Sequence, residues 1–281
     1  MAKVISFMNN KGGVGKTITA HTVGLSWARM GKRILFVDLD SQGNLTSMVS
    51  VSDPMKQTWD RTIEDAFLEG SDGKGLPILH TENPLVDYVP ADLDLANFEK
   101  DTVRKPFNEL LLMDLLDGGV KDPYDFVIID CAPAIQKLTY NAMIASDYLA
   151  IVTTLDGKSA KGVEMTINVY NEVIQNKRFN PSLKLIGIIA TMYMNDNVNK
   201  FYWEYFQKHF SNLIIHPYIR RSTMVDRATS FNQSIFEVDP KGRVVDDYLR
   251  VAQDLLVRIM DDMVHSGEAV IGEDGIARIV K

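Results

Sequence analysis

The chain has 281 residues, of which 46 % are hydrophobic and 24 % are charged, a composition typical of a globular protein. The net charge of −7 excludes a protein coated in basic surface, so any nucleic-acid contact must come from a local patch. The single cysteine excludes a disulfide framework and a metal site built from several cysteines. Because the sequence has no membrane-spanning apolar run and no signal-peptide pattern, we expect a cytoplasmic protein.

The acidic residues are unevenly distributed along the chain. The stretch from Asp53 to Asp130 holds 18 Asp and Glu residues but only 7 Lys and Arg residues, an excess larger than that of the whole chain. The rest of the sequence is therefore mildly basic on balance, which leaves room for a positive face.

Short apolar segments alternate with helical patterns. Strand patterns cover 3–8, 33–38, 85–91, 125–130, 148–154, 183–193 and 212–218, and helical patterns cover 16–30, 103–116, 160–176, 197–209 and 244–264. Strands separated by helices of this length are typical of βαβ crossovers. We therefore predict an α/β fold with a doubly wound, mostly parallel sheet and helices on both faces.

We expect one domain over residues 1–265. Residues 50–83 contain turn formers and a short helical pattern at 61–70, and we interpret them as an insertion in that domain. The tail, residues 266–281, is rich in glycine and charge, which is compatible with either a frayed end or a small hairpin.

The sequence GGVGKT, Gly12–Thr17, follows a strand pattern and opens a helix, the context of a phosphate-binding loop. Glycines let backbone N–H groups converge on phosphate oxygens, and the helix amino terminus adds partial positive charge. Lys16 would neutralise the β- and γ-phosphates, and the Thr17 hydroxyl would bind Mg²⁺. The predicted fold is therefore P-loop NTPase-like. The predicted nucleotide contacts in this stretch are Lys11, Gly12, Gly13, Val14, Gly15, Lys16, Thr17 and Ile18.

A second lysine, Lys11, precedes the glycines and completes the pattern K-G-G-V-G-K-T, called the deviant Walker A motif. With it the sequence resembles the ParA/MinD group of ATPases. The resemblance implies ATP and Mg²⁺ as cofactors, an ATP-dependent homodimer, and a Lys11 that reaches the phosphates of the partner's nucleotide. A second cation beside the γ-phosphate would also offset charge in the transition state, so Lys11 and Lys16 are both predicted to be catalytic.

Three aspartates stand at the carboxyl ends of strand patterns. Asp38 and Asp40 lie in DLDSQGNLT, similar to the D-x-D-P-Q-G-N-x-T segment of the group except for Ser41. The resemblance implies that Asp40 is catalytic, ordering the attacking water, and that Asp38 lies nearer the Mg²⁺ shell. Asp130 ends the Walker B-type strand DFVIID and would hold Mg²⁺ through water, giving a metal site of Thr17, Asp38 and Asp130.

The segment HPYIRRSTMVDRA resembles the closing segment of partition ATPases, which lines the adenine pocket in that family. Arg221 matches the family arginine and is expected beside the nucleotide. Arg220 and Ser222 stand where the family often has proline and asparagine, so the base contacts depart from the family pattern.

Two other branches of the group fit less well. Nitrogenase-type reductases need two cysteines per chain, and MinD-like proteins end in a basic amphipathic membrane helix. Here the apolar stripe of residues 244–264 is typical of a core helix, and the following MDDMVHSGE is acidic and would be repelled by anionic lipid.

The remaining branch is a plasmid or chromosome partition ATPase. The resemblance implies slow hydrolysis without a partner, non-specific DNA binding with ATP, and release by a ParB-like centromere-binding protein. Such a protein would be nucleoid-associated, without membrane contact. The nucleotide fold starts at the first residues, so we expect no preceding operator-binding helix-turn-helix.

DNA contact would require basic side chains that reach phosphates. The candidates are Lys200, Lys208, Arg220, Arg221 and Arg227, with Lys177 and Arg178 as weaker ones. In the aromatic stretch KFYWEYFQKHF, Phe201, Tyr205 and His209 recur at helical spacing and predict a packed face rather than a base-stacking surface.

Two other functions remain open. One is a nucleotide-switched scaffold of the same superfamily that positions a protein machine without touching DNA, which the overall acidity favours. The other is a metabolic P-loop enzyme such as a synthetase, which is disfavoured because those enzymes lack a matching Lys11 and the 38–46 segment.

Overall fold

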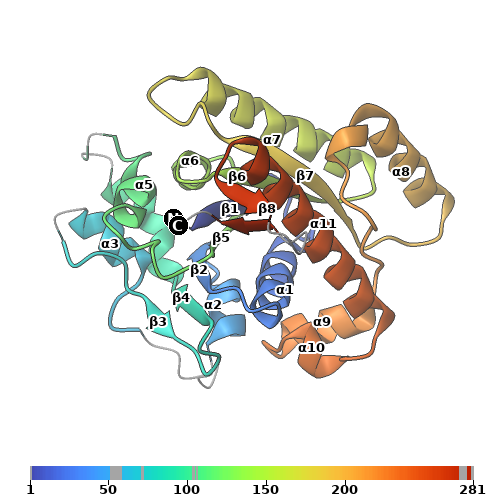
Figure 1. Cartoon of the computed structure of the whole chain (residues 1–281), viewed down its shortest axis with the longest axis horizontal. Helices are drawn as coiled ribbons and strands as arrows, with labels where there is room; N and C mark the ends of the chain where they lie inside the picture. The colour runs from blue at the N-terminus through green and yellow to red at the C-terminus, as the bar shows by residue number, and fades with distance from the viewer. Residues whose placement is uncertain are drawn as a thin grey trace.

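The apolar segments of the sequence form the centre of a sheet in the computed structural model. The structure describes residues 2–50, 59–70, 73–102, 105, 107–271 and 277–279. Within these residues the main sheet has seven strands in the order β3-β4-β2-β5-β1-β6-β7 (Figure 1). The strands are β1 (Lys3–Met8), β2 (Ile34–Leu39), β3 (Leu79–His80), β4 (Val86–Val89), β5 (Phe126–Cys131), β6 (Tyr148–Thr154) and β7 (Lys184–Thr191).

The strands pair in parallel, except for the short edge strand β3, which is antiparallel to β4. Strands β1, β2 and β5 are buried along their whole length, because helices cover both faces of the sheet. The register pairs Asp38 of β2 with Asp130 of β5. Since parallel strands end at the same edge, the sheet itself brings these two carboxylates together.

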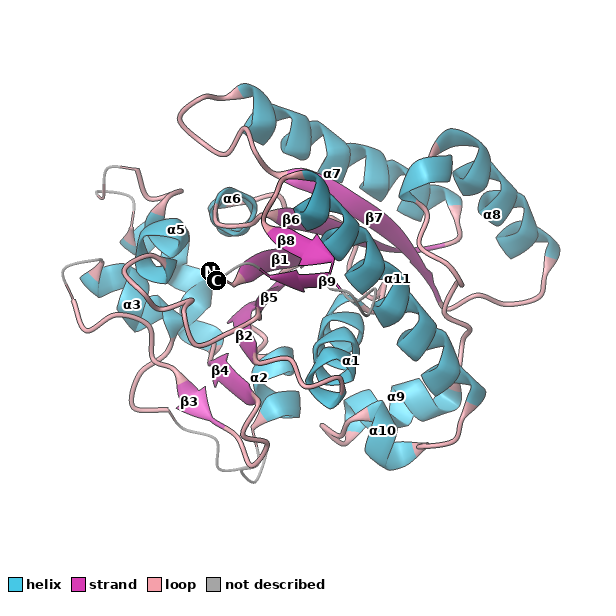
Figure 2. Ribbon diagram, in the orientation of Figure 1, coloured by secondary structure: helices cyan, strands magenta, loops and turns pink. Residues whose placement is uncertain are grey.

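Helices lie on both faces of the sheet (Figure 2). One layer contains α1 and α11, where the Trp27 indole Nε1 donates a 2.9 Å hydrogen bond to the Ala252 carbonyl. The opposite layer contains α3, α5, α6 and α7. The helices are α1 (Lys16–Arg29), α2 (Asn44–Val49), α3 (Ile63–Glu69), α4 (Phe98–Asp101), α5 (Leu111–Leu116), α6 (Lys137–Ile144), α7 (Gly157–Gln175), α8 (Asn197–His209), α9 (Thr223–Ser230), α10 (Ile235–Val238) and α11 (Arg243–His265).

The predicted fold class is confirmed, but two predicted elements are wrong. The pattern at 212–218 forms no strand: residues 211–213 are a 3₁₀ turn, η2 (Ser211–Leu213), and only Ile214 makes an isolated bridge, to Ile188. Beyond it the His216 N–H bonds to Asp254, and Pro217 has no N–H to donate to a ladder.

The predicted helix 103–116 is shorter in the structure. Residues 103, 104 and 106 lie outside the described residues, and α5 begins only at Leu111. Phe107 has φ 56°, a left-handed conformation that a helix cannot contain, and the Leu110 N–H closes a turn on its carbonyl.

Helix α8 has the predicted bounds but turns a different face inward. Phe201 is 61 % exposed and His209 is also exposed, so the packed face predicted from Phe201, Tyr205 and His209 is wrong. The helix packs instead through Phe206, with half-buried Trp203 beside it. Aromatic residues occupy so much of this helix that spacing alone did not identify the buried side.

Helix α11 confirms its predicted core role, because Val245, Tyr248, Ala252, Leu255 and Ile259 are all buried. No helix in the described ranges has the length and apolar character needed to cross a membrane.

In the tail, β8 (Ala269–Ile271) and β9 (Ala277–Ile279) pair in antiparallel fashion, so the hairpin alternative is the one observed. Within the predicted insertion, residues 51–58 and 71–72 lie outside the described residues.

Candidate nucleotide-binding site

The loop between β1 and α1 has the backbone of a phosphate-binding loop. Gly13 and Gly15 have φ values of 71° and 80°, a region that glycine adopts without steric cost. Lys16 is the first residue of α1 and is 6 % exposed, and its Nζ donates a 3.2 Å hydrogen bond to the Lys11 carbonyl. Burial lowers the pKa of Lys16, while nearby Asp130 acts in the opposite direction. The loop thus lies at a helix amino terminus beside a buried cation, an arrangement that suits an anion.

Asp130 is a buried carboxylate beside this loop. It is fully buried, and neither of its oxygens accepts a hydrogen bond of good geometry from the part of the chain that the structure describes. Burial, and next the charge of Asp38, raise the pKa of Asp130 well above its usual range, and the nearby Thr17 hydroxyl opposes this only in part. A buried carboxylate without partners is costly unless a cation binds it, so Asp130 fits a Mg²⁺ site.

Asp38 has more partners than Asp130. Its Oδ2 accepts hydrogen bonds from the Thr46 N–H (2.8 Å) and the Thr46 hydroxyl (2.7 Å), and its Oδ1 accepts one from the Asp40 N–H (3.0 Å). Burial nevertheless raises the pKa of Asp38 to about 6. Asp38 therefore fixes the start of α2 while it lies next to Asp130.

Asp40 is the third carboxylate of the cluster. It is 9 % exposed, its Oδ1 accepts a 3.0 Å hydrogen bond from the Gln42 N–H, and its charge acts on Lys16. The structure thus places Lys16, Asp38, Asp40 and Asp130 near one another beside the glycine loop.

Lys11 is held by its own chain. Its Nζ donates to Asp156 Oδ2 (2.8 Å), Ser159 Oγ (2.8 Å) and Thr154 Oγ1 (3.2 Å). Burial alone would raise the pKa of Asp156, but hydrogen bonds from Lys11, Thr154 and Ser159 hold it below its usual range. Lys11 therefore has a specific intramolecular partner in the single chain.

Sequence reasoning missed Thr154, Asp156 and Ser159. Asp156 is the N-cap of α7 and accepts a 3.0 Å hydrogen bond from the Ser159 N–H. The signal was available, because an aspartate two residues after a strand pattern favours a helix start. We expected the helix to begin at residue 160, three residues beyond its actual start at Gly157, and so the cap was not recognised.

A small pocket of about 40 Å³ adjoins the glycine loop on the side of α9 and α11. Arg221 lines it together with Gly15 and Ile18, so the arginine predicted to contact the nucleotide lies beside the loop. Arg220 also lines this pocket, but its guanidinium forms a two-point ion pair with Asp247, through Nε (2.5 Å) and Nη2 (2.8 Å).

The candidate DNA contacts are divided among separate elements. Lys200 and Lys208 are exposed on α8, whereas Arg227 is exposed on α9 at a different place in the molecule (Figure 1). Arg221 is exposed in the loop before α9, and Arg220 is engaged with Asp247. The weaker candidates Lys177 and Arg178 follow the end of α7. The structure therefore does not gather these cations into one compact patch.

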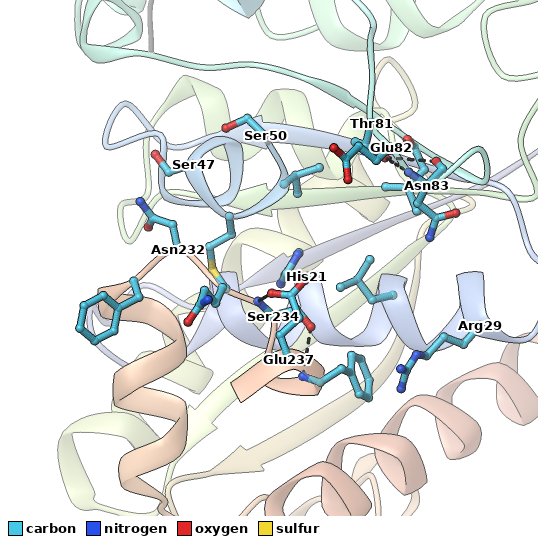
Figure 3. A pocket seen from close by; sticks show the side chains of 17 residues that line it. His21, Arg29, Ser47, Ser50, Thr81, Glu82, Asn83, Asn232, Ser234 and Glu237 are labelled. Carbon is cyan, nitrogen blue, oxygen red and sulfur yellow. Dashed lines mark hydrogen bonds between the residues drawn. The ribbon is translucent and has the colours of Figure 1, made fainter. Parts of the chain in front are cut away.

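A larger groove of about 630 Å³ lies between α1, α2, the turn before β4, and α10. Figure 3 shows His21 in the middle of it, between Ser234 and Glu237 on one side and the turn 81–83 on the other. His21 is 2 % exposed, its Nδ1 has no hydrogen-bond partner among the described residues, and burial lowers its pKa to about 4. Because no residue of the glycine loop lines this groove, it is distinct from the phosphate site.

The sheet order, the glycine loop before α1 and the carboxylates at the strand ends define a P-loop nucleotide-binding protein. Residues 2–185 match the family described as AAA domain. Sporulation initiation inhibitor protein Soj of Bacillus subtilis is 32 % identical over 256 residues, which are 91 % of this chain and 98 % of Soj. Chromosome partitioning protein ParA of Caulobacter vibrioides is 30 % identical over 261 residues, which are 92 % of this chain and 96 % of that protein. The chain therefore belongs to the ParA/Soj family within the ParA/MinD superfamily, as the deviant Walker A motif predicted.

Solved structures agree with this fold. Cobyrinic acid a,c-diamide synthase from Mycobacterium smegmatis, with bound ADP and magnesium, has a TM-score of 0.75 and 26 % identity and aligns over 95 % of this chain and 97 % of its own. A McdA–ATP complex from Cyanothece has a TM-score of 0.78 over 92 % of this chain and 96 % of its own. At 18 % identity the McdA match supports the fold alone.

Proposed function

We propose that this chain is an ATP-dependent dimerising ATPase of plasmid or chromosome partition. In the ATP state it binds DNA without sequence preference, and a ParB-like partner that stimulates hydrolysis releases it. The observation that carries the proposal is the pair of lysines, Lys11 and Lys16, on one phosphate loop in a chain related to Soj and ParA over more than nine tenths of its length.

ATP and Mg²⁺ are the proposed cofactors. Lys16 and the loop N–H groups would bind the phosphates, and Thr17 and Asp130, with Asp38 behind them, would hold the ion. The Arg221 side of the loop would receive the adenine. Relatives of this fold are known with ADP and magnesium or with ATP, which supports the assignment.

Hydrolysis requires an ordered water and compensation of charge on the γ-phosphate. We assign Asp40 to the water, because it is a mostly buried carboxylate beside Lys16. We assign Lys11 and Lys16 to the developing negative charge. With Lys11 engaged by Asp156, a single chain would lack one of the two cations, which supports slow turnover outside the dimer.

The dimerisation step follows from the same contact. To reach the phosphate of a second copy, Lys11 must leave Asp156, Thr154 and Ser159. The Lys11 and Asp156 side chains are 31 % and 37 % exposed, so the ion pair is partly screened by water and is worth about 1 kcal/mol or less. A charged triphosphate can therefore compete for this lysine.

The deciding experiment measures molecular mass and DNA retention of the protein with ATP, ADP and a non-hydrolysable ATP analogue. We expect a dimer that retains DNA with ATP and the analogue, and a monomer that does not with ADP. We also expect Asp40→Ala to hydrolyse ATP at least tenfold more slowly and to remain dimeric with ATP. Normal hydrolysis by Asp40→Ala would show that another group orders the water.

The alternative function is a nucleotide-switched scaffold that positions a protein machine. The observations that support this alternative are the division of the candidate cations between α8 and α9 and the pairing of Arg220 with Asp247. Dimerisation with ATP but no DNA retention at low salt would select this alternative and reject the partition role.

A further inference from the structure

Three of the acidic residues between residues 53 and 130 lie together at a place that the nucleotide site does not use. Glu64, in the first turn of α3, lies against the turn that follows β4, where the 3₁₀ helix η1 (Leu93–Asn97) begins. One carboxylate oxygen each from Glu64, Asp92 and Asp94 lie within 4.8 Å of one another. Three negative groups this close repel one another unless a cation or protons intervene.

Glu64 differs from an ordinary surface carboxylate, because it is mostly buried and yet has no partner among the described residues. It is 8 % exposed, and its carboxylate forms no hydrogen bond or ion pair with any described residue. Its carboxylate is directed at Asp92 and Asp94 rather than at a donor. A mostly buried acidic side chain whose carboxylate lies against two other carboxylates lacks the donor or cation that such a group normally has.

The charges of neighbouring residues add to the repulsion at the Glu64 carboxylate. The nearby charged side chains that act on the Glu64 carboxylate are those of Asp94, Asp101, Asp92 and Asp65. All four neighbours named are acidic, and no lysine or arginine in the described part of the chain forms an ion pair with the cluster.

Two of the neighbouring carboxylates, those of Asp65 and Asp92, already accept hydrogen bonds from the backbone. Asp65 accepts a 2.8 Å hydrogen bond from the Thr62 N–H in the capping box of α3. Asp92 Oδ1 accepts a 3.1 Å bond from the Asp94 N–H and caps η1, which holds the two turn carboxylates in a fixed relation. The cluster thus combines two ordered segments that present oxygen ligands to the same point.

We propose that Glu64, Asp92 and Asp94 bind a divalent cation of the Ca²⁺ class. Ca²⁺ takes six to eight oxygen ligands at about 2.3–2.6 Å, so two of its ligand oxygens lie at most about 5 Å apart, as these carboxylates do. Three carboxylates from two segments leave room for water ligands, and a groove of about 440 Å³ at Asp92 and Asp94 supplies access. Mg²⁺ demands a stricter octahedron and keeps more of its waters, so a flexible three-carboxylate site suits Ca²⁺ better.

The ion would join two parts of the fold that already contact each other. The Ile63 N–H donates to the Pro90 carbonyl (2.9 Å), and the Ala91 N–H donates to the Thr46 hydroxyl (3.0 Å), which in turn donates to Asp38. A cation here would fix the turn next to these bonds. The site shares no residue with the phosphate site, so the inference stands independently of the proposed function.

Calorimetric titration of the nucleotide-free protein with CaCl₂, without Mg²⁺, tests the proposal. We expect one calcium site that disappears in Glu64→Gln and is weakened at least tenfold in Asp94→Asn. Asp122→Asn, which removes an exposed carboxylate elsewhere, and Asp130→Asn, which alters the nucleotide carboxylates, should both retain it. Calcium binding that survives Glu64→Gln, or that is lost in Asp130→Asn instead, would overturn the proposal.

Thermal unfolding gives a second readout that does not depend on heat of binding. Calcium should raise the midpoint temperature of thermal unfolding of the wild type by several degrees and leave that of Glu64→Gln unchanged. In chelator, Glu64→Gln should unfold at a higher temperature than the wild type, because it removes a repelled charge. Equal calcium shifts in the two proteins would contradict the site.

Discussion

The Lys11 ammonium lies 2.8 Å from the Asp156 carboxylate of the same chain, although the two residues are 145 positions apart in the sequence. Asp156 also caps α7, and Thr154 and Ser159 complete the set of acceptors around the lysine. The residue expected to act on a second copy of the chain is therefore engaged within the first.

Asp156→Asn should favour the ATP-dependent dimer. Asparagine is an equally good N-cap, so α7 should keep its start while Lys11 loses its ionic partner. We expect half-maximal dimerisation at a several-fold lower ATP concentration, measured by light scattering coupled to size exclusion. Lys11→Ala is the matched control and should bind nucleotide as a monomer. An ATP requirement that is unchanged in Asp156→Asn would mean that this ion pair does not restrain the lysine.

DNA binding should depend on the exposed lysines of α8 and not on Arg220. Removing one lysine that binds a DNA phosphate reduces the slope of log affinity against log salt by about 1, so the double variant Lys200→Ala, Lys208→Ala should lower the slope by about 2 for each chain of the dimer that contacts DNA. Arg220→Ala breaks the ion pair with Asp247 and should affect stability with little change in slope. Titrations of fluorescent duplex DNA at several salt concentrations measure this. If the α8 double variant keeps the wild-type slope of log affinity against log salt, the DNA-binding surface lies elsewhere.

Stability without added metal should fall as the pH rises from about 4.5 to about 7, because of Glu64. Its folded pKa is about 7, raised from an ordinary 4.5, so over this interval the folded chain holds a proton that the unfolded chain has released. The contribution of Glu64 is thus greatest below pH 4.5 and is lost as the carboxyl ionises. Urea unfolding at pH 5 and pH 7.5 should show this loss in the wild type and a smaller one in Glu64→Gln. The same pH dependence in both proteins would assign it to another group.

Gly24→Ala should destabilise the fold by about 1–3 kcal/mol through overpacking. A methyl group at Gly24 would lie 2.3 Å from Cζ of Phe36, a closer approach than packed carbon atoms allow. Chemical denaturation measures the change in the free energy of unfolding. The control is the same substitution in a Phe36→Leu background, where the ring atoms are gone and the added cost should be smaller. Equal costs in both backgrounds would show that the Phe36 ring is not the obstacle.

Residues close together in the sequence were enough to predict the phosphate loop. The strand 3–8, the glycines and Lys16 form one continuous segment, and its local pattern required no information about the rest of the chain. The positions of Asp38 and Asp130 were predictable for a related reason, since each ends a strand and parallel strands end at the same edge. Lys11 extended the prediction to a family, which the relatives confirmed.

The partners of these residues were decided only by the tertiary structure. Lys11 meets Asp156 because β1 and β6 are neighbours in the sheet, and Glu64 meets Asp92 because α3 folds back on the end of β4. Similarly, the buried face of α8 depends on which surface the sheet offers it, and this made Phe206 rather than Phe201 the buried ring. Hydrophobic period and turn residues report short-range preferences, whereas ion pairs, carboxylate clusters and buried faces depend on contacts across the chain. For this protein the sequence by itself determined the nucleotide loop and the family, and the fold decided what restrains Lys11 and where unpaired negative charge collects.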